Sequence, residues 1–209
     1  MNIFIFLFLF LYLLLCLYRL DWAVLFLIAT LPSYLLRFEV LGLPSTVLEG
    51  MILISFVTWW LTRTNFKGFL QGEYGVKDYI NNSRKRGRYP FGIEIIILLL
   101  VSFSAVAVAG FEMDALGLWR AYFFEPLLVF ILILNIFPSR KEIWKPVGAL
   151  CLSGLAVSLF AIVQKFTGWA VPADYWGPGT VNRVTSVYDY PNALGLYVVP
   201  VSLLALGWG

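Results

Sequence analysis

Histidine is absent from the 209-residue sequence, and charged residues make up only 13% of it. Without histidine, neither a histidine general base nor a histidine metal ligand is possible within this chain. An average soluble domain carries about 25% charged residues. Hydrophobic residues reach 61% here, more than one water-soluble core of this size can bury. These proportions predict an all-α, polytopic transmembrane helical bundle.

Cysteine is also scarce. Cys16 and Cys151 lie in separate apolar stretches, far from any cluster of metal-ligand residues. Two buried thiols are therefore a simpler interpretation than a disulfide or a metal site. We expect no metal and no cofactor. The net charge of +3 is small, and we expect no nucleic acid partner.

Seven apolar runs are candidates for membrane-spanning helices, which need about 20 residues. Full helical hydrogen bonding within each run makes them viable in lipid. The first two runs are short. Either they form a tight hairpin around Arg19-Leu20-Asp21, or one of them lies only partly across the membrane. The predicted spans, within one transmembrane domain covering 1–209, are 3–18, 22–36, 45–62, 91–109, 120–137, 146–166 and 191–208.

Helix-start signals support the later boundaries. Thr46 and Glu49 have the spacing of a capping box where the third span begins. Pro146 opens the sixth run, and Pro191 stands where the seventh begins, a position that tolerates a missing N–H.

Lysine and arginine predict the orientation of the spans. The 63–90 loop carries seven Lys and Arg against two acidic residues, and the 138–145 loop carries three against one. Such loops remain on the cytoplasmic side. We therefore expect a cytoplasmic loop at 63–90 and exported segments at 110–119 and 167–190. The orientation of the amino terminus stays open.

Five ionisable residues fall within the predicted spans, where they are costly and tend to mark function. Glu49 and Glu94 lie in the first turn of their runs, which favours helix capping for both. Lys165 ends the sixth run, which favours an interfacial anchor. Arg120 and Glu125 open the fifth run.

Glu125 lies more than one turn inside its run, where an unpartnered carboxylate is expensive. A spacing of five residues separates Arg120 and Glu125 by about 140° on an α-helix, so we do not expect them to pair with each other. Pro126 is expected to free backbone carbonyls locally. Structural packing and substrate contact both remain open for Glu125.

The segment from Gly168 to Pro191 contains many glycines, prolines and aromatic residues, which excludes a continuous helix. Arg183 is its only Lys or Arg, and a guanidinium matches phosphate oxygens. Asn192 follows at the start of the next helix, where free N–H groups favour an anion. The residues alone leave two interpretations, a phosphate site and an interfacial anchor.

The run from Arg183 to Gly195 resembles a signature of the O-antigen ligase and polymerase superfamily, approximately Arg-x-x-Gly-x-x-x-x-Pro-Asn-x-x-Gly. Arg183, Pro191, Asn192 and Gly195 fit this pattern, whereas Ser186 stands where the family usually has glycine. The segments 164–168 and 116–126 also resemble the family. The resemblance covers the chain as the amino-terminal half of such a protein.

Members of this superfamily are multi-span glycosyltransferases of the bacterial inner membrane. The resemblance implies a polyprenyl-pyrophosphate-linked glycan as donor, with an acceptor hydroxyl attacking the anomeric carbon as the lipid pyrophosphate leaves. Arg183 would stabilise the negative charge on the leaving group. Asn192 would bind phosphate or sugar, or cap the span. Arg120 and Glu125 complete the predicted substrate-binding residues.

The family normally continues with further spans and an exported loop that carries arginine and histidine. Because histidine is absent and the sequence stops within an apolar run at Gly209, we expect a truncated sequence that is inactive as it stands. Ligase and polymerase remain unresolved, as do the glycan and the acceptor. The alternatives are a multi-span transporter or lipid flippase, and a non-catalytic membrane scaffold.

Overall fold

The computed structural model describes residues 2–40, 43–63, 92–139, 141–179 and 181–207. Nearly all of the predicted cytoplasmic loop at 63–90 lies outside these ranges. The described chain is mostly helical, with one small two-stranded sheet, so the predicted helical character is confirmed. It divides into two compact units, which are described separately: Met1–Met51 together with Phe137–Gly209, and Ile52–Ile136.

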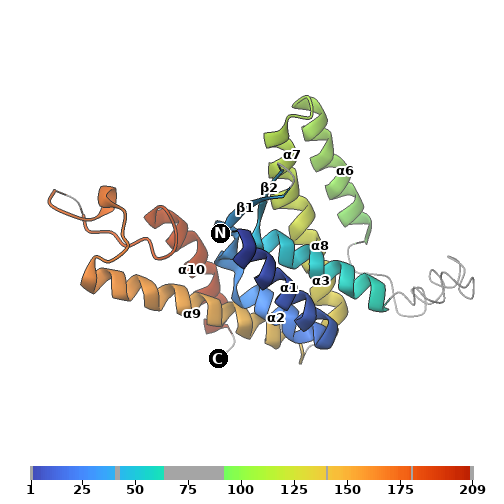
Figure 1. Cartoon of the computed structure of the whole chain (residues 1–209), viewed down its shortest axis with the longest axis horizontal. Helices are drawn as coiled ribbons and strands as arrows, with labels where there is room; N and C mark the ends of the chain where they lie inside the picture. The colour runs from blue at the N-terminus through green and yellow to red at the C-terminus, as the bar shows by residue number, and fades with distance from the viewer. Residues whose placement is uncertain (1, 41–42, 64–91, 140, 180, 208–209) are drawn as a thin grey trace, which may run out of the picture. The chain divides into compact units, whose positions relative to one another are not determined.

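In its described residues, the first unit contains four α-helices, two 3-10 helices and the sheet, and helix α3 begins in it and continues into the second unit (Figure 1). In chain order the elements are α1 (Asn2–Tyr18), α2 (Leu20–Ala29), η1 (Leu31–Leu35), β1 (Arg37–Val40), β2 (Leu43–Thr46), α3 (Val47–Arg63), α9 (Trp144–Thr167), η3 (Ala173–Tyr175) and α10 (Pro191–Leu206).

A tight hairpin around residues 19–21, one of the two alternatives for the first two apolar runs, is present. Helix α1 ends at Tyr18 and α2 begins at Leu20. The Arg19 guanidinium donates two hydrogen bonds to the Asp21 carboxylate, at 3.0 Å and 2.9 Å. Across the hairpin, the Tyr12 hydroxyl donates to the carbonyl of Ala23 at 3.0 Å. The turn is therefore closed by side chains on both helices.

The predicted span at 22–36 is not one helix. Helix α2 ends at Ala29 and a 3-10 helix with Pro32 near its start follows. Proline disfavours the α conformation of the residue before it and has no N–H to donate, which accounts for the break. The ten residues of α2 rise about 15 Å, half the thickness of a hydrocarbon core of about 30 Å.

The capping box at the start of α3 is confirmed. The Glu49 N–H donates to the Thr46 hydroxyl at 3.1 Å, and the Thr46 N–H donates to the Glu49 carboxylate at 3.4 Å. Ser45 also donates to this carboxylate at 2.8 Å. Glu49 is buried, so protein groups rather than interfacial water satisfy it.

The antiparallel hairpin of β1 and β2 was not predicted. Its register pairs Arg37 with Thr46 and Glu39 with Pro44. The sequence does alternate between polar and apolar residues at Arg37, Phe38 and Glu39, a pattern typical of a half-buried strand. In the structure Phe38 is buried, whereas Arg37 and Glu39 are exposed. Two strands of only four residues are easily overlooked beside long apolar runs.

Helices α9 and α10 pack closely within the first unit. The Tyr197 hydroxyl of α10 donates to the Ser153 hydroxyl of α9 at 2.7 Å. The buried face of α9 includes Ser153, Gly154, Val157, Ala161 and Gln164. Its other face exposes a row of large apolar side chains, Leu152, Leu155, Leu159, Ile162 and Phe166. Exposed apolar surface of this extent is typical of a surface that contacts lipid or protein.

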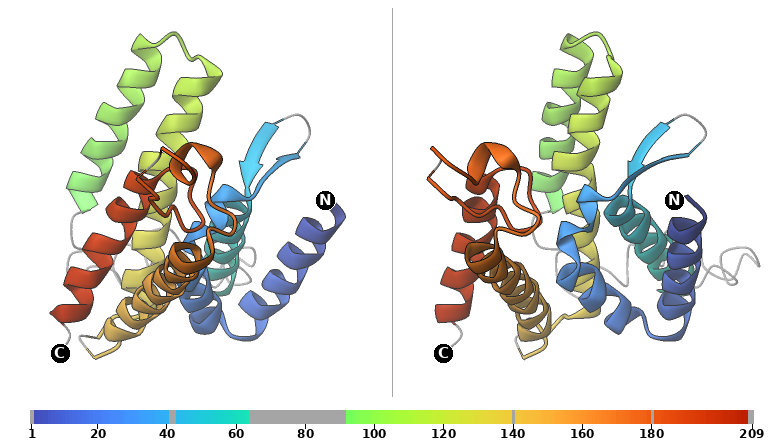
Figure 2. Two further views of the ribbon diagram at one scale, coloured as in Figure 1. Left: turned by 90° about the vertical axis from the view of Figure 1, so that its left-hand side faces the viewer. Right: turned by 60° about the vertical axis from the view of Figure 1, so that its left-hand side comes forward.

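The second unit contains the remainder of α3 and a helical hairpin in which α6 (Gly92–Val108) packs beside α7 (Met113–Trp119) (Figure 2). The chain then continues through the π-helical turn η2 (Arg120–Phe124) into α8 (Glu125–Ile136). The Trp119 indole donates to the Ser102 hydroxyl at 3.0 Å and packs edge-on against Phe103. These contacts join the two arms of the hairpin.

Among the described residues, two helices are long and apolar enough to cross a membrane, Met113–Ile136 and Trp144–Thr167. Their 24 residues each rise about 36 Å. Five further apolar helices have 10–17 residues. Helices thus occupy all seven predicted segments, with the second interrupted, but length and composition qualify only two of them as spans.

The close approach of α9 and α10 predicts a sensitive position at Gly154. A Cβ atom there would lie 2.6 Å from Cγ1 of Val201, whereas a Cβ at Gly195 of α10 would meet nothing within 4 Å. We expect Gly154→Ala to lower the free energy of unfolding by about 1–3 kcal/mol through overpacking. Gly195→Ala should be neutral or slightly stabilising. Thermal unfolding in detergent measures both, and equal midpoints would contradict the packing described.

Candidate functional site

Residues 168–190, called here the Arg183 loop, connect α9 to α10, and their described part contains one short helix, η3. The prediction that this segment is not a continuous helix is confirmed. Helix α9 ends where Gly168 adopts a left-handed conformation with φ of 66° and donates its N–H to the carbonyl of Gln164 at 2.7 Å. The Trp176 indole lies against Gly168, where a Cβ atom would clash with it. Glycine is therefore required at this turn for two reasons.

Gln164 connects the last turns of α9 to both ends of the Arg183 loop. Its amide nitrogen donates to the carbonyls of Ala170 at 3.2 Å and Ser186 at 2.9 Å. Its amide oxygen accepts from the N–H groups of Thr185 at 3.1 Å and Ser186 at 2.6 Å. The side chain is 0% exposed. Four hydrogen bonds therefore use the donors and both lone pairs of one buried amide.

Ser186, the position at which the resemblance expects glycine, has a left-handed backbone with φ of 55°. Glycine adopts this region readily, whereas other residues do so at a cost. Ser186 is held there by its contacts, because its hydroxyl donates to the carbonyl of Val157 at 2.7 Å. The departure from the family pattern therefore falls on a position with a glycine-like conformation.

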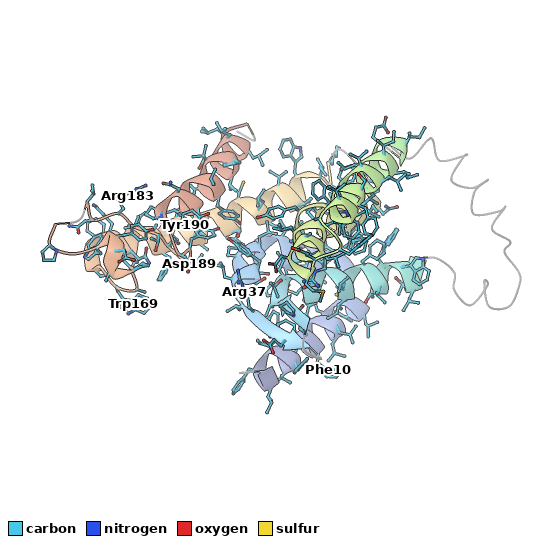
Figure 3. The ribbon with its side chains drawn as sticks, turned by 90° about the horizontal axis from the view of Figure 1, so that it is seen from above. Phe10, Arg37, Trp169, Arg183, Asp189 and Tyr190 are labelled. Atoms are coloured by element: carbon cyan, nitrogen blue, oxygen red, sulfur yellow. The ribbon has the colours of Figure 1, made fainter. Side chains whose placement is uncertain are left out.

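Arg183 and Asn192, both predicted as substrate-binding residues, contact each other. One terminal nitrogen of the guanidinium donates to Oδ1 of Asn192 at 2.8 Å, and the Arg183 N–H donates to the carbonyl of Tyr175 at 3.0 Å. Figure 3 shows Arg183 on the loop beside Tyr190, close to the start of α10, with Trp169 at the opposite edge of the loop.

Asn192 does not cap α10. Tyr190 occupies the N-cap position of this helix, without a side-chain hydrogen bond to its first turn. The side chain of Asn192 instead orients the guanidinium. An exposed arginine fixed beside a helix start presents several N–H donors of one charge in a small space, an arrangement that binds phosphate.

Lys165 also holds the Arg183 loop. Its ammonium donates to the carbonyl of Asn182 at 3.2 Å and lies 5.7 Å from the centre of the Trp176 ring, within the range of a cation–π interaction. The expected role of Lys165 as an interfacial anchor is not tested by these contacts. They give it a second role, the orientation of the residue that precedes Arg183.

Arg120 and Glu125 form a pair, and the prediction that they would not is wrong. Nε of Arg120 lies 3.5 Å from Oε1 of Glu125, which is buried. The α-helical angle does not apply, because residues 120–124 form a π-helical turn in which the Glu125 N–H donates to the carbonyl of Arg120, five residues earlier. Residues five apart are neighbours in this geometry.

Pro126 explains the π-helical turn. Its ring would clash with the carbonyl of Tyr122 in a regular α-helix, and it has no N–H to offer that carbonyl. Widening the preceding turn by one residue relieves the clash and changes the acceptor of the Glu125 N–H. Trp119 and Phe124 stack across the turn with ring centres 5.6 Å apart. The predicted effect of Pro126 was the release of backbone carbonyls; what the structure shows is a π-helical turn before it.

The four predicted site residues thus form two separate pairs. Arg183 with Asn192 belongs to the first unit, and Arg120 with Glu125 belongs to the second. No group of three or more His, Cys, Asp or Glu suited to a metal ion occurs within the described ranges. The chemistry available to the first pair is that of an oriented guanidinium and an amide.

Three buried residues of the first site were missed by sequence reasoning, namely Gln164, Thr185 and Tyr188. The hydroxyls of Thr185 and Tyr188 make no hydrogen bond with the described part of the chain. Burial raises the pKa of the Tyr188 phenol well above its usual value. The only available signal was the position of Gln164, a long amide in the last turns of an apolar helix.

Comparisons with protein-family models, with curated proteins and with solved structures find no match to this chain.

Tyr188, which is buried, and Tyr197, which is half-buried, give a matched pair of predictions. Tyr188→Phe removes an unsatisfied buried hydroxyl and should raise the free energy of unfolding by about 1 kcal/mol. Tyr197→Phe removes the 2.7 Å hydrogen bond to Ser153 and should lower it by a similar amount. Chemical denaturation in detergent measures both changes.

The raised pKa of Tyr188 adds a pH dependence. Above about pH 10 the unfolded chain loses the phenol proton while the folded chain keeps it, so stability falls as the pH rises. Tyr188→Phe should make this fall shallower. A destabilising effect of Tyr188→Phe at neutral pH would contradict the environment described for this hydroxyl.

Proposed function

We propose that this chain is a multi-pass protein of a bacterial inner membrane that binds a polyprenyl-pyrophosphate-linked glycan at its exported face. In this proposal it acts in cell-surface polysaccharide synthesis in the manner of O-antigen ligases and polymerases. The observation that carries the proposal is the contact between Arg183 and Asn192, 2.8 Å long, on a loop anchored by buried hydrogen bonds.

The geometry supports this function in two ways. A guanidinium placed before the reaction stabilises negative charge as it develops, without the cost of reorganising the site. In the proposed reaction that charge appears on the departing lipid pyrophosphate, while an acceptor hydroxyl attacks the anomeric carbon. In addition, the left-handed backbone of Ser186 matches the conformational freedom of the glycine in the family signature.

The proposal assigns all seven helical segments to the membrane. Two helices meet the requirements for a span, and α1, α3, α6 and α10 have 16–17 residues, close to the lower limit of about 17 for a span. Exposed large apolar side chains cover α1, α6 and α9. Lipid is the solvent in which such surfaces need no protein partner.

A second candidate function is a multi-span transporter or lipid flippase. The specific observation that favours it is the π-helical turn with Arg120 and Glu125, inside a helix long enough to cross a membrane. Interrupted helices with ionisable residues are typical of transport sites. Such a site has no need of a cation at residue 183, so substitution of Arg183 separates the two functions.

Replacing Arg183 tests the glycosyltransferase proposal. In cells expressing the full-length protein, Arg183→Ala should reduce transfer of the lipid-linked glycan by about 100-fold or more. Arg183→Lys should retain part of the activity, because lysine keeps the charge but loses the planar fork of donors. Transfer is measured as labelled surface polysaccharide. Arg37→Ala is the matched control, since Arg37 is an exposed cation on β1 of the same unit and should leave transfer unchanged.

Undiminished transfer in both Arg183 variants, at equal protein levels, would contradict the role proposed for this residue. A loss of transfer in Arg37→Ala as large as in Arg183→Ala would show that the general positive charge of the surface matters, rather than the oriented guanidinium.

Cysteine labelling tests the proposed orientation. Cys16 and Cys151 are free thiols and are first replaced by serine. In this background, Gly179→Cys should react with a membrane-impermeant maleimide in intact spheroplasts, whereas Lys77→Cys should react only after the membrane is opened. Three proposed spans separate the two positions. Labelling of both sites in intact spheroplasts would contradict the topology.

A further inference from the structure

Gln164 lies outside the four residues that the proposed function uses, yet it makes more hydrogen bonds to the Arg183 loop than any other side chain in the described part of the first unit. We infer that Gln164 is the positioning residue of the Arg183 site, and that its amide sets the affinity for a lipid-linked pyrophosphate. This inference rests on the proposed function.

Gln164 projects from a rigid support. Gln164 belongs to the buried face of α9, a helix of 24 residues. About three turns before Gln164, the same face packs closely on α10, where a Cβ atom at Gly154 would lie 2.6 Å from Cγ1 of Val201. The backbone from which Gln164 projects is therefore held in place relative to the start of α10.

The Gln164 amide holds the backbone at Thr185 and Ser186. Its oxygen accepts the N–H groups of Thr185 and Ser186, and its nitrogen returns a hydrogen bond to the Ser186 carbonyl. These three bonds fix both peptide groups around Ser186, the residue with φ of 55°. A serine keeps a left-handed conformation only where contacts with its surroundings hold it there. Gln164 makes most of the hydrogen bonds that hold Ser186.

Ser186 is close in sequence to both residues of the site. Arg183 lies three residues before Ser186, and Asn192 lies six residues after it. A further hydrogen bond, from the Arg183 N–H to the Tyr175 carbonyl at 3.0 Å, holds the other side of the arginine. With both sides held, the guanidinium and the Asn192 amide meet at 2.8 Å. Release of the clamp at Ser186 would leave one side free.

A site of this kind binds its ligand tightly because its donors are ordered before the ligand arrives. An arginine on an unrestrained loop would lose conformational freedom on binding the phosphates, and affinity would fall. Gln164 itself need not touch the ligand, because its side chain is fully buried and its four hydrogen bonds are all made with the loop. Its effect is exerted through the position of Arg183.

The test uses the full-length protein in lipid nanodiscs, with undecaprenyl pyrophosphate as the probe. Gln164→Met keeps a long unbranched side chain without the amide, and we expect the affinity for the probe to fall at least about tenfold, the effect of losing one or two net hydrogen bonds. Hydrogen exchange at the amides of Thr185 and Ser186, measured by mass spectrometry, should become faster by the same factor or more.

The matched control is Ser153→Ala. It removes a hydrogen bond from the same buried face of α9, and it should leave both the affinity and the exchange at Thr185 and Ser186 unchanged. Gln164→Glu is the conservative variant, since a carboxylate still accepts the two N–H groups. It should lose less affinity than Gln164→Met, and it replaces Gln164→Met in the comparison if that variant aggregates.

An unchanged affinity in Gln164→Met, with faster exchange at Ser186, would overturn the inference while the proposed function stands. An affinity loss in Ser153→Ala equal to that in Gln164→Met would also overturn it, because general loosening of α9 would then explain both. If wild type and Arg183→Ala bind the probe equally poorly, the proposed function fails, and the inference that rests on it fails with it.

Discussion

The constraint on which this structure depends is that polar groups removed from water must find partners inside the protein. In a chain with so few charged residues, a handful of side chains meet this requirement. Gln164 satisfies backbone groups at two ends of a loop, and Glu49 satisfies the start of α3. Where proline removes a donor, the backbone itself changes, as it does before Pro126.

The same constraint links the fold to the proposed chemistry. An irregular segment of more than twenty residues would normally be mobile, and a mobile arginine is a poor stabiliser of charge. Here the loop is held by the amide of Gln164, by the Ser186 hydroxyl and by the Lys165 ammonium. The guanidinium of Arg183 therefore has a defined position although it lies outside any helix or strand.

Much of the helical pattern could be predicted from the sequence, because apolar runs and their first-turn signals are local properties. The Thr46 and Glu49 capping box and the start of α10 at Pro191 depend on residues a few positions apart. Arg183 and Asn192 were predicted as substrate-binding residues from the family resemblance and from phosphate chemistry, but their contact with each other was not predicted. The anchor of their loop was not predicted either, because Gln164 reaches residues 21 and 22 positions away, beyond any local pattern. The prediction that Arg120 and Glu125 do not pair was wrong for a different reason, because the angle between them was calculated for a regular α-helix.

The π-helical turn at residues 120–124 has a consequence for how the helix from Met113 to Ile136 is aligned with others. A π-helical turn accommodates one residue more than an α-helical turn, which is equivalent to a single-residue insertion. Side chains before and after it are out of phase by about 100°, the rotation of one residue. A regular α-helix of the same length could be superposed so that its side chains point as those of α7 do, or as those of α8 do, but not both at once. Related chains that lack a proline at position 126 should therefore align with this one only across a one-residue gap.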